Sequence, residues 1–379
     1  MANEAVLIAA ISGRALASSA RRGGYLPLVA DFFGDQDTVA AAQAHVALRT
    51  SLAQGFREQD LASALERLAD HHVPIGIVCG TGFEDRPRLL ARLEQRWRLF
   101  GNDAHTVARA KDPETFAAVC RDCDVAHPRV TLSPPPAREG FLAKRRGGAG
   151  GAHVGDASAK EFGQDVYYQS RAPGRPVSAL LLANGGSAIV LGFSKQWACP
   201  TVRQPFRYGG AVRPADIAPG LAKRLAESAC RLAVALSLKG LNSADFMVDG
   251  DDFSILEVNP RPGATLDIFE IDGGSLFALH MAACEGSLID EAPRFHAAKA
   301  SAIAYAERDV TAPARFEWPD WSADRPSAGI AINRGEPFCT VHAGGATASE
   351  ARALVHERLA QVHRWMQDWT RDWIHANAP

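Results

Sequence analysis

The sequence predicts a chain of several domains that combines α/β and α+β structure, and three observations support this class. Strand-like and helix-like segments alternate over the first hundred residues. Further along, several strands follow one another with Gly, Pro and Asn turns between them. The chain has 379 residues, which is long for one simple core. We therefore expect a parallel sheet first and an antiparallel sheet after it.

Composition restricts the classes of function. Hydrophobic residues make up 47% of the chain and charged residues 22%, as in ordinary globular proteins. The formal net charge of -2 gives no basic field, so we expect no nucleic-acid partner. No apolar run approaches the roughly 18 residues of a membrane span, and we expect no membrane partner. The N-terminal "MANEAVLIAAIS" reads as a strand rather than a signal peptide.

The first hundred residues predict a parallel sheet with helices on its faces. Strands are expected at 5–12, 25–33 and 74–85, and helices at 14–23, 61–71 and 86–101. The turn after the first strand, "SGR", lacks the G-x-G-x-x-G pattern. A NAD-linked oxidoreductase built on this region is therefore disfavoured.

Seven cysteines are scattered along the chain, and an odd number in a chain of this size predicts no disulfide framework. A reducing, cytoplasmic location follows from that interpretation. Cys120 and Cys123 form one C-x-x-C inside a predicted helix. Without a second pair or a strand-to-helix junction, we interpret them as ordinary packing residues rather than a redox or metal pair.

The middle of the chain changes to antiparallel patterning. "GFLAKRRGGAGGAHVG" predicts a short strand followed by a basic, glycine-rich turn, and residues 165–197 predict several strands. The segment 219–238 predicts a helix with leucines on one stripe.

A long C-terminal helix is expected from about Ser349. Thr347 and Glu350 fit a capping box at its start. Apolar residues recur along it at steps of three and four, which makes an amphipathic seam. This seam can pack on its own domain or form a homodimer contact. Its members are Val355, Leu359, Val362, Met366, Trp369 and Trp373.

The stretch "ILEVNPRPGAT" at 255–265 holds the most specific pattern. Side chains alternate along a strand, so Ile255, Glu257 and Asn259 are expected on one face. Prolines on both sides keep Arg261 extended, so it continues this row. Glu257, Asn259 and Arg261 should therefore project together from the end of a strand.

The neighbouring strand supplies a second carboxylate. A three-residue loop at 250–252 would place Asp245 directly opposite Glu257, with Cβ atoms roughly 5 Å apart. Carboxylates at that distance repel each other unless a cation lies between them. Mg²⁺ takes oxygen ligands of this kind together with substrate phosphates, and an arginine can bind the phosphate. A solvated polar strand end with no metal is the alternative, and the metal interpretation requires an odd-length loop.

These motifs resemble the ATP-grasp superfamily of ligases, in its biotin carboxylase-like, carboxylate–amine ligase group. "SADFMVD" with "FSILEVNPRPGATLD" is similar to the family's metal-binding hairpin, and "FLAKRRGGAGGAHV" to its lysine strand and phosphate loop. "ARAKDPETF" and "YYQSRAPGRPVS" resemble its first lysine and its adenine hinge. The C-terminal strands resemble the last segment of biotin carboxylase-like chains. The resemblance implies an ATP-grasp fold with a Rossmann-like pre-grasp domain at 1–103, a small flexible lid at 104–168 and an antiparallel central domain at 169–379.

The resemblance also implies roles for individual residues. ATP and Mg²⁺ are the implied cofactors, with Mn²⁺ able to replace Mg²⁺. Asp245, Glu257 and Asn259 would hold the metal, and Arg261 and Lys144 would be catalytic. The implied ATP contacts are Lys111, Lys144, Gly147, Gly148, Gly150, Gly151, Gln169, Ser170, Arg171 and Ala172. Weaker candidates for substrate contacts are Ser178, Lys195, Arg203 and Arg207.

The implied activity is an ATP-dependent carboxylate–amine ligase that forms an acyl phosphate. "SGRALASSARRGGYLPLVADFFGDQDT" is similar to ATP-grasp proteins linked to one-carbon carrier cofactors of the methanopterin or methanofuran type in methylotrophs. That likeness implies addition of glutamate or an aromatic amine. Thr265 stands where a biotin carboxylase has a glutamate, which disfavours bicarbonate and biotin chemistry. A non-catalytic or regulatory ATP-binding module is the alternative.

Overall fold

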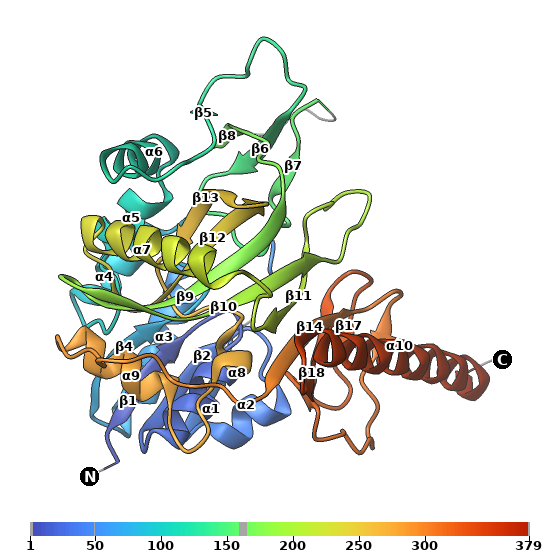
Figure 1. Cartoon of the computed structure of the whole chain (residues 1–379). Helices are drawn as coiled ribbons and strands as arrows, with labels where there is room; N and C mark the ends of the chain where they lie inside the picture. The colour runs from blue at the N-terminus through green and yellow to red at the C-terminus, as the bar shows by residue number, and fades with distance from the viewer. Residues whose placement is uncertain (1–2, 49, 159–164, 378–379) are drawn as a thin grey trace.

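The computed structural model describes residues 3–48, 50–158 and 165–377, with side chains up to Trp369. Figure 1 shows a parallel α/β unit at the N-terminus, a small sheet above it, a large antiparallel sheet, and a long helix that projects from the body near the C-terminus. No helix in the described residues is long and apolar enough to cross a membrane.

The N-terminal unit is a four-stranded parallel sheet in the order β3-β2-β1-β4. Its strands are β1 (Ala5–Ala9), β2 (Leu26–Asp31), β3 (Ala44–Ala47) and β4 (Pro74–Cys79). Its helices are α1 (Arg14–Arg22), α2 (Gln36–Ala41), α3 (Glu58–Asp70) and α4 (Pro87–Glu94). The predicted parallel sheet is confirmed, but sequence patterning missed β3. That edge strand has four residues and no buried side chain, so it lacks an apolar signal.

The small sheet follows two helices, α5 (Ala104–Lys111) and α6 (Pro113–Asp122). Its strands lie in the order β5-β8-β6-β7, with bounds β5 Val130–Thr131, β6 Phe141–Arg145, β7 Val154–Asp156 and β8 Val166–Ser170. Strand β8 pairs with β5 and β6 and so belongs to this sheet. It runs across the predicted domain boundary at 168.

The large sheet has eight strands in the order β13-β12-β9-β10-β11-β14-β18-β16, and every pairing is antiparallel. The strands are β9 (Arg175–Asn184), β10 (Ala188–Ala198), β11 (Tyr208–Arg213), β12 (Lys239–Asp249), β13 (Asp252–Asn259), β14 (Ala298–Tyr305), β16 (Ser322–Ala323) and β18 (Pro337–Gly345). Strands β15 (Val310–Thr311) and β17 (Ala331–Ile332) form a separate pair. The predicted antiparallel central sheet is confirmed.

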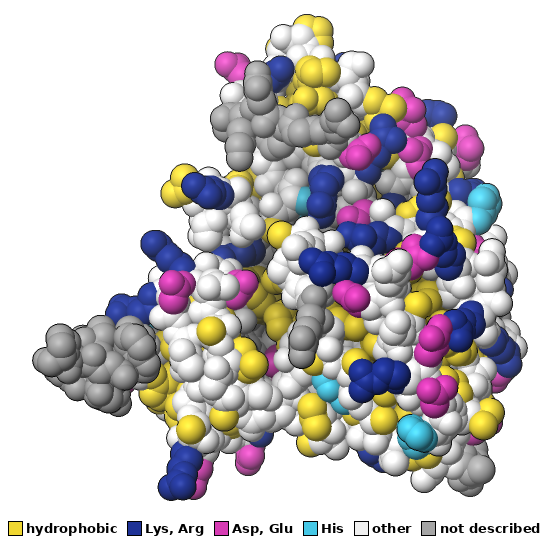
Figure 2. Space-filling model, turned by 180° about the vertical axis from the view of Figure 1, so that it is seen from behind, with side chains coloured by type: hydrophobic (Ala, Val, Ile, Leu, Met, Phe, Trp, Pro, Cys, Tyr) yellow, Lys and Arg dark blue, Asp and Glu magenta, His cyan; other side chains and the backbone are white. Residues whose placement is uncertain are grey.

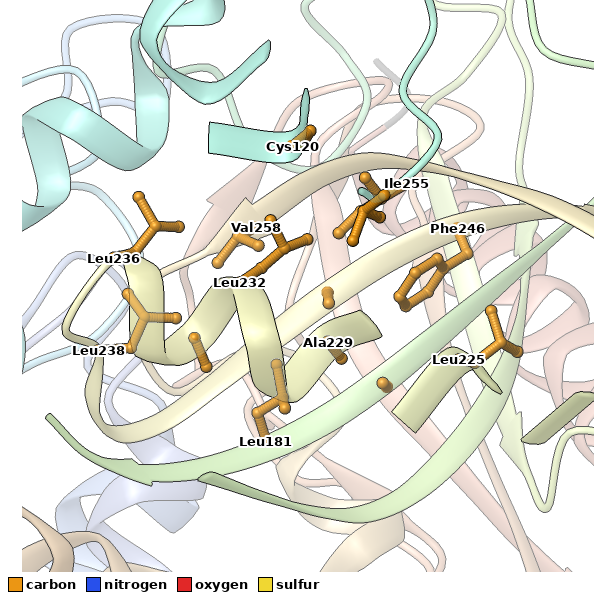
Figure 3. Close-up of a cluster of buried hydrophobic side chains, with 14 of the residues drawn as sticks. Cys120, Leu181, Leu225, Ala229, Leu232, Leu236, Leu238, Phe246, Ile255 and Val258 are labelled. Carbon is orange, nitrogen blue, oxygen red and sulfur yellow. The ribbon is translucent and has the colours of Figure 1, made fainter. Parts of the chain in front are cut away.

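Helices cover both faces of this sheet. The first face packs against α7 (Pro219–Ala235), whose leucine stripe meets the strands in the cluster of Figure 3. Cys120 lies in the same cluster and is fully buried, so it is a packing residue as interpreted from the sequence. The other face packs against the N-terminal unit and two helices, α8 (Leu266–Phe269) and α9 (Leu276–Cys284).

The C-terminal helix α10 (Ala348–Asn377) begins with the predicted capping box. The Glu350 N–H donates to the Thr347 hydroxyl at 3.2 Å, and the Glu350 carboxylate accepts from the Thr347 N–H. Val355, Val362 and Met366 pack against β14 and β18, so the seam covers its own domain. The side chain of Trp373 lies outside the described residues. A homodimer contact along α10 stays a prediction.

A charged network joins the N-terminal unit to the large sheet. The Arg14 guanidinium donates to both Asp267 oxygens, at 2.6 and 2.5 Å, and to Asp324 at 3.1 Å. Burial alone would raise the pKa of Asp267, but Arg14 lowers it to about 2. Asp35 is also buried here, and it caps no backbone N–H of α2. Burial, with Asp324 and Asp31 nearby, raises the pKa of Asp35 to about 8.

Asp35→Asn should stabilise the protein more at pH 8 than at pH 5. Between an unfolded-state pKa near 4 and the folded value of about 8, the folded state binds the extra proton, so Asp35 costs stability as pH rises. Urea unfolding at both pH values measures the difference. Asp251→Asn, in an exposed turn, is the control and should show no such trend. An effect of D35N that is equal at both pH values would contradict the assignment.

Leu232→Ala should reduce the free energy of unfolding by about 2–5 kcal/mol, because Leu232 is fully buried between α7 and the sheet. Val234→Ala is the matched control on the same helix, since its side chain is 42% exposed. It should change stability by less than about 0.5 kcal/mol. Equal losses in the two variants would show that α7 does not pack as described.

Candidate active site on the acidic hairpin

The hairpin β12–β13 pairs Asp245 with Glu257, as the sequence predicted, but its turn and its strand register differ from the prediction. The turn contains two residues, Gly250 and Asp251, because Asp249 pairs with Asp252. A bulge on β13 then shifts the register between Phe246 and Asp245 and leaves Leu256 unpaired. The predicted three-residue loop is wrong, and the bulge restores the carboxylate pair.

The bulge also changes which side chains share a face. Ile255 packs in the α7 cluster with Phe246 and Val258, so its predicted place beside Glu257 is wrong. Leu256 instead lines a cavity together with Glu257. Alternation along the strand fails here because the extra residue reverses the facing of everything before it.

The two carboxylates lie among two lysines and an amide. Lys111, at the end of α5, donates to the Asn259 Oδ1 at 2.7 Å and lies 3.4 Å from the Glu257 carboxylate. The Asn259 amide nitrogen donates to Asp245 Oδ2 at 2.9 Å. Lys144, on β6, is nearly fully buried close to Glu257. These predicted ATP and metal residues, which come from three separate segments, therefore meet at one place.

The charges of this group are strongly coupled. Burial would raise the pKa of Glu257, but Lys111 and Lys144 lower it to about 2. Burial and the charge of Glu257 raise the pKa of Asp245. Asp245 Oδ1 is buried and makes no hydrogen bond of normal geometry, although Ser178 lies close enough to lower that pKa. Burial lowers the pKa of Lys144, and Glu257 opposes that effect.

Arg261 lies at the end of the row but is held by a partner that the sequence did not reveal. Its Nε donates to Glu84 Oε1 at 2.6 Å, and Glu84 is buried in the loop after β4. Burial would raise the pKa of Glu84, but Arg261 and Lys111 lower it. Glu84 also accepts the Gly82 N–H at 2.8 Å, so the N-terminal unit fixes the direction of Arg261.

The glycine-rich loop between β6 and β7 packs against the N-terminal unit on one side and against the segment before β11 of the large sheet on the other. A Cβ on Gly147 would lie 2.6 Å from the Glu84 carbonyl oxygen, and one on Gly151 would overlap the Phe206 carbonyl. The Gly150 carbonyl accepts from the Tyr208 N–H at 2.8 Å. A Cβ on Gly148 would overlap the ring of His153. Glycine is thus required by close backbone approach.

A narrow cavity that is open to solvent lies beside the acidic hairpin. Its apolar wall includes Phe116 and Leu256, and its polar wall includes Lys111, Glu257 and the loop residues Gly147 and Gly148. Figure 2 shows Lys and Arg side chains gathered between the small sheet and the body of the molecule. The lining suits a ligand that has an apolar end and an anionic end.

The predicted hinge residues divide into two groups. Gln169 is buried, lines the cavity and donates to the Leu256 carbonyl at 3.3 Å. Ser170, Arg171 and Ala172 follow it but do not belong to the described cavity lining. Arg171 points outward and pairs with Asp156 at 3.3 Å.

The four weaker substrate candidates also separate. Ser178 pairs with Asp245 and shares its face. Lys195 pairs with Val177, which packs in the α7 cluster, so Lys195 lies on the opposite face. Arg203 is exposed. Arg207 donates to the Cys199 carbonyl and stacks on Tyr305.

Two half-buried histidines in the cavity lining were missed by sequence reasoning. Burial lowers the pKa of His153, and Glu257 opposes this while Lys144 and Lys111 reinforce it, leaving a value of about 4. Burial and Lys144 likewise lower the pKa of His127 to about 4. His153 lies directly after the glycine-rich turn, and that position is the one sequence signal that could have indicated it.

The parallel N-terminal unit, the small sheet with its glycine loop and the large sheet with its acidic hairpin define the ATP-grasp fold. Residues 120–265 match the family described as ATP-grasp domain. The predicted ATP-grasp fold is confirmed by this match and by the structural likeness below.

Proteins of known structure share this fold. The biotin carboxylase of Campylobacter jejuni, solved with β-γ-ATP, superposes with a TM-score of 0.71 and 14% identity over 92% of this chain and 89% of that one. N5-carboxyaminoimidazole ribonucleotide synthetase, solved with ADP, superposes with a TM-score of 0.68 and 15% identity. The match covers 94% of this chain and 96% of that one.

A curated relative is the carbamoyl phosphate synthase large chain of Thermus thermophilus. It is 26% identical over an alignment of 231 positions, and the alignment covers 52% of this chain and 22% of the relative. The chain therefore spans about a fifth of that protein.

Gly151→Ala should displace the glycine-rich loop, because its Cβ would overlap the Phe206 carbonyl and the residue has φ +71°. Cleavage by trypsin after Arg145 and Arg146 should accelerate at least about fivefold, which corresponds to about 1 kcal/mol of local destabilisation. Gly150→Ala is the control, since Gly150 has a similar φ of +68° but open space around it. If both variants are cleaved at the same rate, the loop does not rest on Phe206.

Proposed function

We propose that this protein is an ATP-dependent carboxylate–amine ligase that makes an amide bond. The observation that carries the proposal is the Asp245–Glu257 pair, joined to Asn259 and to two buried lysines beside a cavity covered by a glycine loop. A protein that only binds nucleotide has no need to hold two opposed carboxylates in this environment.

We place ATP along this cavity in one orientation, from the chemistry of its lining. Its adenine would lie against Phe116 and His127 near Gln169, and its phosphates would lie near Lys111, Lys144 and the N–H groups of the glycine loop. Lysine ammonium groups and close glycine backbone are typical phosphate ligands.

The acidic group fits Mg²⁺ in its chemistry. Asp245 Oδ1 is an orphaned buried oxygen, and Lys111 already places a cation against Asn259 and Glu257. Two carboxylates and an amide, from Asp245, Glu257 and Asn259, would be the protein's ligands. Such a set leaves room for phosphate oxygens, as Mg²⁺ prefers, and Mn²⁺ has similar preferences. When bound, the metal neutralises charge on the phosphates.

The reaction then proceeds in two steps. A substrate carboxylate oxygen attacks the γ-phosphorus, and the bond from phosphorus to the ADP oxygen breaks. The amine nitrogen next attacks the acyl carbon, phosphate leaves with the C–O electron pair, and the nitrogen releases a proton. Lys144 and Arg261 contribute by neutralising and orienting the anions, and Glu84 holds Arg261 in place.

The substrates follow from the sequence likeness noted above. We assign the enzyme to the biosynthesis of a one-carbon carrier cofactor in the cytoplasm, with glutamate or an aromatic amine as acceptor. Mass spectrometry of products from a panel of carboxylates and amines with MgATP tests this substrate assignment.

Glu257→Gln should lower carboxylate-dependent ADP release by about 100-fold or more, because it removes one of the two charges that hold the metal against the phosphates. Asp252→Asn is the matched control: it lies on the same strand, is exposed at the turn and should keep full activity. ADP release is followed in a coupled assay at saturating Mg²⁺. Undiminished turnover in E257Q would refute the metal role of the hairpin.

A further inference from the structure

The glycine-rich loop is held near its ends by backbone contacts to neighbouring units and in its middle by one side chain of its own segment. Gly147 lies against the loop after β4, and the Tyr208 N–H donates to the Gly150 carbonyl at 2.8 Å. Between these contacts the ring of His153 packs against Gly148 so closely that a Cβ on Gly148 would overlap the ring. The half-buried His153 therefore supports the middle of the loop.

The His153 ring also bonds the backbone of the loop. Its Nδ1 lies 3.3 Å from the Ala149 carbonyl oxygen. A carbonyl oxygen only accepts hydrogen bonds, so Nδ1 carries the ring proton and donates it. Because a peptide group is planar, this bond also fixes the direction of the Gly150 N–H, which donates to no group in the described part of the chain. His153 thus orients a free backbone donor of the kind that binds phosphate.

The opposite edge of the ring, Nε2, is not suited to bind phosphate itself. It has no hydrogen-bond partner among the described residues, and His153 lines the cavity beside Lys111 and Glu257. Burial lowers the pKa of His153 to about 4, with Glu257 opposing and Lys144 and Lys111 reinforcing the effect, so the ring is neutral at pH 7. With the proton on Nδ1, Nε2 can only accept a hydrogen bond, whereas a phosphate oxygen requires a donor. The two lysines supply charged donors instead.

We infer that His153 is a positioning residue for the triphosphate and holds the middle of the glycine loop over the phosphates that Lys111 and Lys144 bind. This inference rests on the proposed function and adds to it the residue that keeps the loop ordered. A loop that is ordered before the ligand arrives loses less conformational entropy on binding. His153 therefore contributes to the affinity for the phosphates beneath the loop, and not to the affinity for the base near Phe116.

Three substitutions in the full chain separate the two edges of the ring. In His153→Asn the amide nitrogen takes the place of Nδ1 and can still donate to the Ala149 carbonyl. In His153→Gln the amide reaches the position of Nε2 instead, and His153→Ala lacks both edges. His105→Ala is the matched control, because His105 is exposed on α5 and does not belong to the described cavity lining.

Calorimetry then measures the Kd of MgADP and of a magnesium-bound, non-hydrolysable ATP analogue for each variant. Loss of the bond and of the ordered loop should raise both Kd values about tenfold in H153A and H153Q. The values for H153N and H105A should stay close to that of wild type. AMP lacks the β- and γ-phosphates, so it should bind every variant as it binds wild type, measured by competition with MgADP. Unchanged AMP binding also shows that the variants are folded.

Trypsin cleavage after Arg146 without nucleotide reports on the loop directly, and it should accelerate in H153A and H153Q but not in H153N. Wild-type affinity for MgADP in H153A would overturn the inference. Rescue by H153Q instead of H153N would also overturn it, because Nε2 would then bind the phosphates directly. An equal loss of AMP and MgADP affinity would show a general structural role and overturn it as well.

The same variants keep the ligase function separate from the role of His153. If the nucleotide affinities follow the expected pattern but no carboxylate stimulates ADP release by wild type, the proposed function fails and the role of His153 stands. If wild type shows carboxylate-dependent ADP release but the three His153 variants bind MgADP equally well, the role of His153 fails and the proposed function stands.

Discussion

The closeness of two half-buried carboxylates, Asp245 and Glu257, is the constraint on which the rest of this site depends. Two such groups side by side would ordinarily repel each other or share a proton. Here Lys111 and Lys144 hold Glu257 ionised, while the pKa of Asp245 is raised. The pair thus creates a place for further positive charge. The glycine loop, the cavity and the Arg261 side chain all lie around this carboxylate pair.

Much of this site could be predicted from the sequence because its residues lie close together along one hairpin. The spacing of Glu257, Asn259 and Arg261 follows from strand alternation, and Asp245 lies across one turn. The two-residue turn and the bulge at Leu256 could not be predicted. The shorter turn shifts the pairing by one residue, and the bulge shifts it back, so Asp245 still pairs with Glu257. A bulge depends on how two strands pack against their neighbours, which alternation along one strand does not record. Ile255 was misplaced for the same reason.

Contacts between distant segments were harder to foresee. Glu84 reaches Arg261 across 177 positions of sequence, and Arg14 joins Asp267 across 253. Neither pair leaves a periodic pattern. The strand β3 was missed because it is short and half-buried. By contrast, the alternation of strands and helices, the leucine stripe of α7 and the capping box of α10 depend on near neighbours, and the structure confirms them. Prediction from sequence therefore succeeded within elements and failed between them.

One measurement tests the central claim directly: a crystal structure of the protein with Mn²⁺ and a non-hydrolysable ATP analogue. The anomalous signal of Mn²⁺ locates the cation independently of the surrounding atoms. We expect a peak at bonding distance from Glu257 and from Asp245 or Asn259, with the Lys111 ammonium moved from Asn259 to the phosphates. A peak bound to phosphate alone, with Lys111 still bonded to Asn259, would contradict the account.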